Sequence, residues 1–141
     1  MGVKVNAQTK KGCTALHWAA GSDSESPAII ATLIYHSAKV NLRAKDGRTP
    51  LHLASIDKSP TTIALLLATG AKVNIKGKNG WTPLHIAAGV SKYPEVIEAL
   101  AKEGASTVRD KHGYLPYDYL VENPNVTTKD NIYWILDFGR Y

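Results

Sequence analysis

Thr49-Pro-Leu-His-Leu-Ala-Ser55 is a stretch that recurs along the chain at a nearly fixed interval. It has two close copies, Thr14-Ala-Leu-His-Trp-Ala-Ala20 and Thr82-Pro-Leu-His-Ile-Ala-Ala88, and a weaker fourth copy, Leu115-Pro-Tyr-Asp-Tyr-Leu-Val121. A glycine stands two places before every copy, and these glycines are separated by 35, 33 and 33 residues: Gly12, Gly47, Gly80 and Gly113. Self-similarity at such a period is the signature of a repeat protein.

A second motif keeps the same period. Val5-Asn6, Val40-Asn41 and Val73-Asn74 each stand seven residues, counted from Val to Gly, before the next repeat glycine. Together the two motifs cover nearly the whole chain, and they resemble the ankyrin repeat, whose period is about 33 residues and whose signature is T-P-L-H-x-A. The resemblance implies an all-α solenoid of about four helix-loop-helix-finger units with a right-handed overall winding.

The residues support this fold independently of the resemblance. The Thr that opens each close copy can accept a hydrogen bond at a helix N-terminus, and Pro50 and Pro83 suit the first turn, where no N–H is needed. A second apolar stripe at helical spacing predicts one more buried helix face per unit: Ile30/Leu33/Ile34, Ile63/Leu66/Leu67 and Ile97/Leu100/Ala101. Gly70 and Gly104 should end two of these helices in a left-handed conformation, whereas Ser37 predicts a weaker cap.

The repeats predict a single domain over residues 1–141. Its expected parts are a partial finger (1–11), three repeats (12–46, 47–79 and 80–112) and a degenerate C-terminal capping repeat (113–141). Because one unit cannot bury its own apolar face, neighbouring units must stack. The partial finger indicates a fragment of a longer repeat protein, and the alternative is a chain that begins with a bare finger.

The last unit departs from the others. Asp118 replaces the repeat histidine, which in this family commonly ties its own repeat to neighbouring backbone, so the change fits a cap that has no further neighbour. Thr128–Phe138 carries Ile132 and Leu136 at helical spacing and predicts the second helix of this unit. Trp134 either wraps the final layer or forms part of an exposed apolar face.

Composition excludes several classes of protein. The chain has 141 residues, 44% of them apolar, and no apolar run approaches the roughly 18 residues that cross a bilayer, so no membrane insertion is expected. A lone cysteine, Cys13, excludes an internal disulfide framework and favours a cytoplasmic, reducing compartment. The nucleus, or specialised secretion of a parent protein, is left open.

The histidines are better explained as structural residues than as ligands or catalysts. His17, His52 and His85 recur once per repeat, whereas the ligands of one metal ion must converge on a point. Cys13 near His17 could suggest a nucleophile and its base, but Cys13 occupies a repeat slot that elsewhere holds Arg48, Trp81 and Tyr114. We therefore predict no catalytic residue, no metal, no cofactor and no enzyme activity.

That slot precedes each first helix, at the root of the finger. By resemblance, such positions line the concave recognition face together with residues just after the Ala-Ala. The predicted partner-binding residues are Trp81, Tyr114, Arg48, Cys13, Ile56, Asp57, Lys58 and Val90, with Ser91 and Lys92 beside them. Arg, Trp and Tyr are enriched at binding hot spots, so Trp81 and Tyr114 could form one aromatic patch flanked by Arg48. Trp18, Tyr117 and Tyr119 are expected in the core.

The predicted fingers are basic. The first three carry +9, against +5 for the whole chain, so the remainder carries −4. Lys45, Lys76 and Lys78 should steer a protein partner with an acidic surface, and a merely solvated edge is the alternative. Phosphate groups would also suit this edge, but no base-reading motif accompanies it, so nucleic acid is not the expected partner.

The predicted function is a protein–protein interaction module, acting as an adaptor, scaffold or targeting domain of a longer repeat protein. The alternative is a stand-alone inhibitor that occludes an enzyme's active site, since some four-repeat ankyrin proteins inhibit kinases in this way. A third possibility is a stack that positions a catalytic domain outside these residues.

Overall fold

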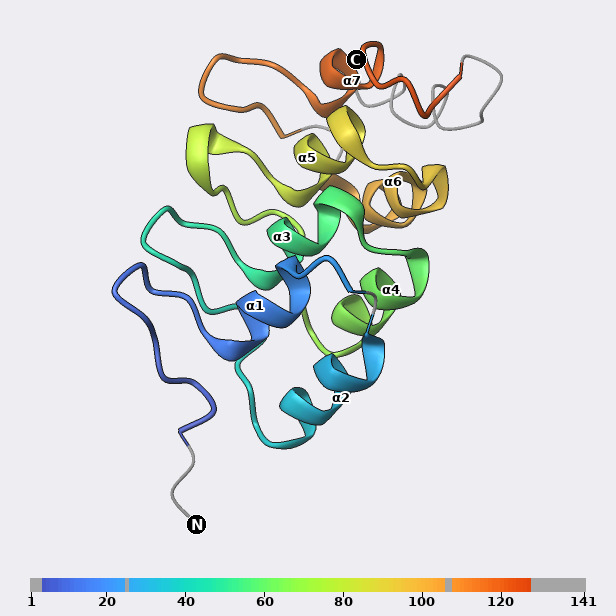
Figure 1. Ribbon diagram of the computed structural model, residues 1–141. Helices are drawn as coiled ribbons and strands as arrows, with labels where there is room; N and C mark the ends of the chain where they lie inside the picture. Colours follow the sequence, from blue (N-terminus) through green and yellow to red (C-terminus); the bar gives the residue numbers. More distant parts are fainter. Residues whose placement is uncertain (1–3, 25, 106–107, 128–141) are drawn as a thin grey trace.

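A computed structural model describes residues 4–24, 26–105 and 108–127 of the chain. Figure 1 shows short helix pairs stacked along one axis, with hairpin-like fingers projecting to one side. The helices are α1 (Ala15–Gly21), α2 (Pro27–Tyr35), α3 (Pro50–Asp57), α4 (Pro60–Ala68), α5 (Pro83–Val90), α6 (Pro94–Leu100) and α7 (Pro116–Leu120). Single-turn segments lie at Lys78–Gly80 and Ala101–Ala105. The predicted all-α architecture is confirmed, with no strand among the described residues.

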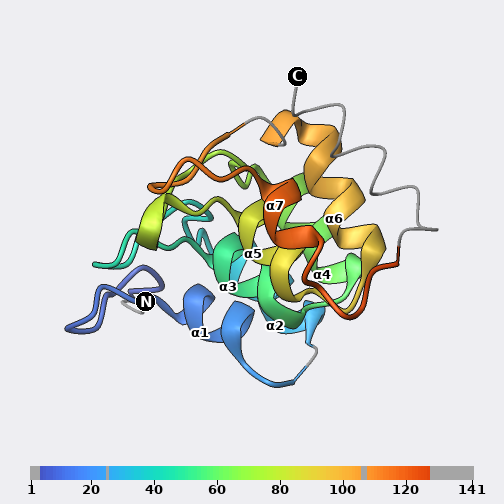
Figure 2. The same ribbon diagram turned by 90° about the horizontal axis from the view of Figure 1, so that it is seen from above.

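The helices form two rows. α1, α3, α5 and α7 pack against one another in sequence, and α2, α4 and α6 form the second row. Seen down the stack, the first-helix row lies between the fingers and the second-helix row (Figure 2). The predicted helix of residues 128–138, including Trp134, lies outside the described residues.

Each first helix begins as the motif predicts. The Thr82 hydroxyl accepts from the His85 backbone N–H over 3.4 Å, and the Thr82 N–H donates to His85 Nδ1 over 3.2 Å. Two backbone donors that the helix leaves unpaired are thereby satisfied. In the last unit the Leu115 N–H donates to Asp118 Oδ2 over 2.8 Å, so Asp118 retains the backward half of this cap.

The core runs between the two rows as one continuous cluster. Each repeat contributes a leucine from its first helix and an isoleucine from its second, all at most 1% exposed: Leu16, Leu51, Leu84, Ile30, Ile63 and Ile97. Burial of each such side chain contributes about 1.5–3 kcal/mol. The predicted second stripe is confirmed, with Leu33, Ile34 and Leu67 partly buried against this cluster.

The Val-Asn motif clamps consecutive repeats together. Asn41 Nδ2 donates to the Gly70 carbonyl over 2.9 Å, and its Oδ1 accepts from the Lys72 N–H over 2.8 Å. Asn6, in the partial finger, makes the same pair of bonds with Ser37 and Lys39 of the first repeat. Gly70 has the predicted left-handed φ of +100°, and Ser37 adopts the same conformation at +71° without being a glycine. Ser37 therefore carries backbone strain that Gly70 avoids.

The fingers have the same turn, and each packs beside the next one along the stack. In the third finger, the Gly77 N–H donates to the Trp81 carbonyl over 2.8 Å. Gly80 has a φ of +74°, and a Cβ there would lie 2.7 Å from the Lys111 nitrogen. That close approach exists because the Lys111 N–H donates to the Asn79 carbonyl of this finger over 3.0 Å. Glycine is required here by both conformation and space.

Candidate protein-binding face

The face between the first helices and the fingers carries two rows of side chains with one member per repeat. We call it the inner face. The finger-root row is Cys13, Arg48, Trp81 and Tyr114, and the helix row is Trp18, Leu53, Ile86 and Tyr119. Tyr114 is 53% exposed and Trp18 is 68% exposed, while the other members are half-buried.

The repeat histidines position the finger-root row. The Nε2 atoms of His17, His52 and His85 lie 3.0, 2.9 and 3.0 Å from the carbonyl oxygens of Arg48, Trp81 and Tyr114, respectively. Each histidine thus holds the backbone of the candidate binding residue in the next repeat. Because Nδ1 accepts from the backbone N–H of the capping Thr, Nε2 carries the proton and donates it to that carbonyl. The predicted structural role of these histidines is confirmed.

Burial favours the neutral form of His52 and His85. Loss of hydration lowers the pKa of His52 and outweighs the opposing effect of its hydrogen bond to the Trp81 carbonyl. Burial likewise lowers the pKa of His85, against the hydrogen bond to Tyr114 and the nearby charge of Asp110. A neutral imidazole with one donor and one acceptor is the species that this geometry needs.

One groove on the inner face brings together much of the predicted binding set. It has a volume of about 250 Å³ and is lined by Arg48, His52, Ile56, Lys78, Trp81, Ile86 and Val90. Ile56 and Val90 are 41% and 50% exposed. The groove therefore has an apolar lining with cationic groups from Arg48 and Lys78. Five of its members, Arg48, Ile56, Lys78, Trp81 and Val90, were predicted from sequence.

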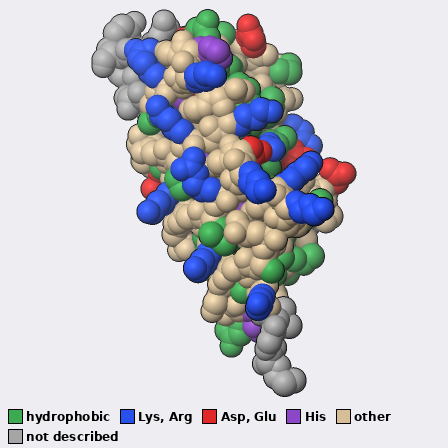
Figure 3. All heavy atoms as spheres, turned by 90° about the vertical axis from the view of Figure 1, so that its left-hand side faces the viewer, with side chains coloured by type: hydrophobic (Ala, Val, Ile, Leu, Met, Phe, Trp, Pro, Cys, Tyr) green, Lys and Arg blue, Asp and Glu red, His purple; other side chains and the backbone are tan. Residues whose placement is uncertain are grey.

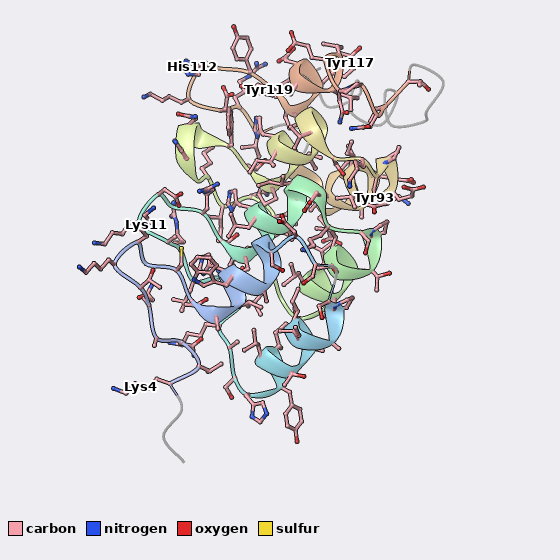
Figure 4. All side chains as sticks on the ribbon, in the orientation of Figure 1. Lys4, Lys11, Tyr93, His112, Tyr117 and Tyr119 are labelled. Carbon is pink, nitrogen blue, oxygen red and sulfur yellow. The ribbon has the colours of Figure 1, made fainter. Side chains whose placement is uncertain are left out.

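The predicted aromatic patch is joined through Tyr119. The Trp81 and Tyr114 rings meet the Tyr119 ring edge to face, with centroids 5.9 and 6.1 Å away. Tyr119 lies on the finger side of α7, and Tyr117 lies on its far side (Figure 4). Both tyrosines pack partly buried against the core, as expected. The patch role of Tyr119 was missed, although it shares the repeat position of Ile86.

Asp110 anchors this aromatic cluster. Trp81 Nε1 donates to Asp110 Oδ2 over 3.1 Å, and the Tyr119 hydroxyl donates to the same oxygen. Burial raises the pKa of Asp110, but hydrogen bonds from Tyr119, Tyr114, His112 and Trp81 outweigh it and lower the pKa below its usual range. The pKa of Tyr119 is raised by burial and by its bond to Asp110. Trp81 is therefore held rigidly as a wall of the groove.

Two predicted surface residues are buried instead. Lys58 is 2% exposed, and its ammonium donates to the Ser22 and Ser24 carbonyls, the latter over 2.8 Å. It fastens the loop of the first repeat to the second and is unavailable to a partner. Ser91 is 0% exposed, and its carbonyl accepts from Asn123 Nδ2 over 3.1 Å. The residues after a first helix thus serve inter-repeat packing as well as the surface.

Trp18 corrects a further expectation. We predicted it in the core, but its repeat position belongs to the inner face, where it is 68% exposed. With Cys13 and Leu53 it lines a separate pocket of about 470 Å³. Cys13 therefore lies outside the groove. Among the other predicted residues, Asp57 is half-buried, and Lys45, Lys76 and Lys92 are exposed beyond the groove lining.

The described residues offer no cluster of three His, Cys, Asp or Glu side chains suited to a metal ion. In the same residues, no helix has the length and apolar character needed to cross a membrane.

Comparison with known families gives one result. The family model described as Ankyrin repeats (3 copies) matches residues 1–77 and 24–111. A comparison with curated proteins gave no match.

Proposed function

This chain belongs to the ankyrin repeat family, whose members are generally protein–protein interaction modules and typically not catalytic, and we propose that it binds a protein partner through the groove on its concave inner face. The four units act together as one binding domain, in an adaptor, scaffold or targeting role. The observation that carries the proposal is the groove lined by Arg48, Ile56, Lys78, Trp81 and Val90.

Rigidity supports this proposal. Trp81 is fixed by Asp110 and Tyr119, and the backbone beneath it is held by His52. A preformed site loses little conformational entropy on binding. Ile56 and Val90 leave apolar surface open to water in the same groove, so covering them with a partner side chain is favourable.

The test is affinity capture from an extract of the native cells with three forms of the chain. Ile56→Gln with Val90→Gln removes apolar surface from the groove. Ile29→Gln with Val121→Gln is the matched control, because these residues are 53% and 54% exposed and lie outside the groove lining. We expect one protein to be retained by the wild type and the control, and lost from the groove variant.

The captured protein is then purified, and its affinity for each form of the chain is measured directly. We expect the groove variant to bind it at least about tenfold more weakly than the control. If the captured protein is an enzyme and this chain abolishes its catalytic activity, the same face has an inhibitory role. Equal recovery on the groove variant and the wild type, with both variants folded by circular dichroism, would contradict the proposal.

A further inference from the structure

The fingertips carry the same cation in every repeat. A lysine stands two residues before each repeat glycine, and all four are exposed: Lys10, Lys45, Lys78 and Lys111. We call this row the lysine ladder. A second exposed row follows four residues before the glycine in the later fingers: Arg43, Lys76 and Arg109.

The ladder is physically continuous because neighbouring fingers are bonded to each other. The Lys45 N–H donates to the Lys11 carbonyl over 2.9 Å, and the Lys111 N–H donates to the Asn79 carbonyl over 3.0 Å. Between them, Arg43 Nη2 donates to the Lys76 carbonyl over 2.7 Å. Viewed from the finger side, Lys and Arg side chains follow the length of the stack with few acidic groups among them (Figure 3).

The acids nearest to the ladder are already engaged. Asp46 pairs with Arg48 Nε over 2.7 Å, and Asp110 is 6% exposed and accepts the hydrogen bonds described above. Between described residues, the salt bridges are Arg48–Asp46 and Lys102–Glu98. Among the described residues, the ladder lysines therefore face solvent, and none of them forms a salt bridge with a carboxylate.

We propose that the lysine ladder binds an acidic, extended segment of the protein partner, laid along the stack axis. This inference rests on the proposed function and specifies the partner's chemistry. Lys78 belongs to both the ladder and the groove. One partner chain can therefore place an apolar side chain in the groove and its adjoining acidic segment along the ladder. Packed helices lie about 8–10 Å apart, and a polyproline II segment advances about 3.1 Å per residue with three residues per turn, so acidic side chains three residues apart lie on one face and match the ladder.

A protein segment fits this surface better than a nucleic acid. Beside Lys78 the groove is lined by Ile56, Ile86 and Val90, which offer no hydrogen bond to a base edge. The Trp81 ring is packed against Tyr119 and bonded to Asp110, which limits it as a stacking platform.

The experiment measures fluorescence anisotropy of a labelled peptide of four Glu-Ser-Ser units bound to the full chain at low salt. A peptide with Gln in place of Glu controls for charge, and an oligothymidylate of matched charge represents nucleic acid. The ladder variant is Lys45→Glu with Lys111→Glu, which leaves the groove residue Lys78 intact. The control variant is Lys39→Glu with Lys72→Glu, which makes the same change of net charge at exposed lysines that belong to neither the ladder nor the second row.

We expect the ladder variant to bind the acidic peptide about tenfold more weakly than the control variant, with a smaller dependence on salt. Equal affinity of the two variants, or an oligothymidylate bound more tightly than the peptide, would overturn the inference. The capture experiment separates the two proposals, because a partner lost from the groove variant but retained by the ladder variant leaves the function standing and removes the ladder.

Discussion

The histidine of each repeat links two neighbouring units through a single side chain. His52 caps its own helix by accepting the Thr49 N–H over 3.0 Å, and it donates to the Trp81 carbonyl of the next finger. The contact with Thr49 needs the neutral ring, because a second proton on Nδ1 would face the Thr49 N–H donor, whereas Nε2 donates to the Trp81 carbonyl in either form. Protonation is therefore coupled to the loss of the helix cap.

This coupling predicts a pH dependence of stability. Because the folded-state pKa values of His52 and His85 are lowered, the unfolded chain binds more protons below about pH 6.5. Their stabilising contribution is fully present above that pH and is lost as the pH falls toward the folded pKa values. We expect the urea concentration at the unfolding midpoint to decrease as the pH is lowered from 7.5 to 5.5.

The matched variant is His52→Gln with His85→Gln, because glutamine can occupy the same capping position without titrating. Its urea midpoint should change less than that of the wild type over the same range. A midpoint change of equal size in both proteins would show that these two histidines do not cause the effect.

At the scale of the element, the finger is held by close backbone packing as well as by its own turn. The sequence could predict the turn from the repeat glycine and its Val-Asn motif. It could not predict that Trp81, Asp110 and Tyr119 meet, because these residues belong to a finger root, the next finger and the next first helix. The pattern also misplaced Trp18, since an apolar residue within a helix can face either the core or the inner face.

The two kinds of glycine predict different costs of substitution. Gly80→Ala introduces a strained φ and a Cβ 2.7 Å from the Lys111 nitrogen, whereas Gly70→Ala introduces the strain with nothing within 4 Å. We expect Gly70→Ala to lower the free energy of unfolding by about 1 kcal/mol and Gly80→Ala by about 2–4 kcal/mol. Urea unfolding of both variants measures the difference. Equal losses of unfolding free energy would mean that crowding the contact between the third and fourth fingers does not lower stability.

At the scale of the whole molecule, periodicity made the fold predictable. Helix starts, buried stripes and the structural histidines all follow from the period, and five groove residues follow from the repeat slots. The exceptions are residues whose environment depends on a particular neighbour. Lys58 occupies a position next to the inner face, but carbonyl oxygens of the preceding loop surround its ammonium and bury it.

Stacking also explains why recognition would be concentrated on one face. Every repeat places a finger root and one first-helix residue on the inner face, so side-chain differences between repeats create a patterned surface without altering the core. The groove between the second and third repeats is apolar with cationic groups, and the lysine ladder extends this charge along the fingers.

The most direct measurement is site-specific photo-crosslinking in the native extract, with a photoreactive amino acid placed at Val90 in one protein and at Ile29 in another. Both sites are similarly exposed, at 50% and 53%, but only Val90 lines the groove. Binding in the groove predicts a discrete crosslinked protein from Val90 and none from Ile29. A partner crosslinked from Ile29 and absent from Val90 would place binding on the second-helix side and contradict it.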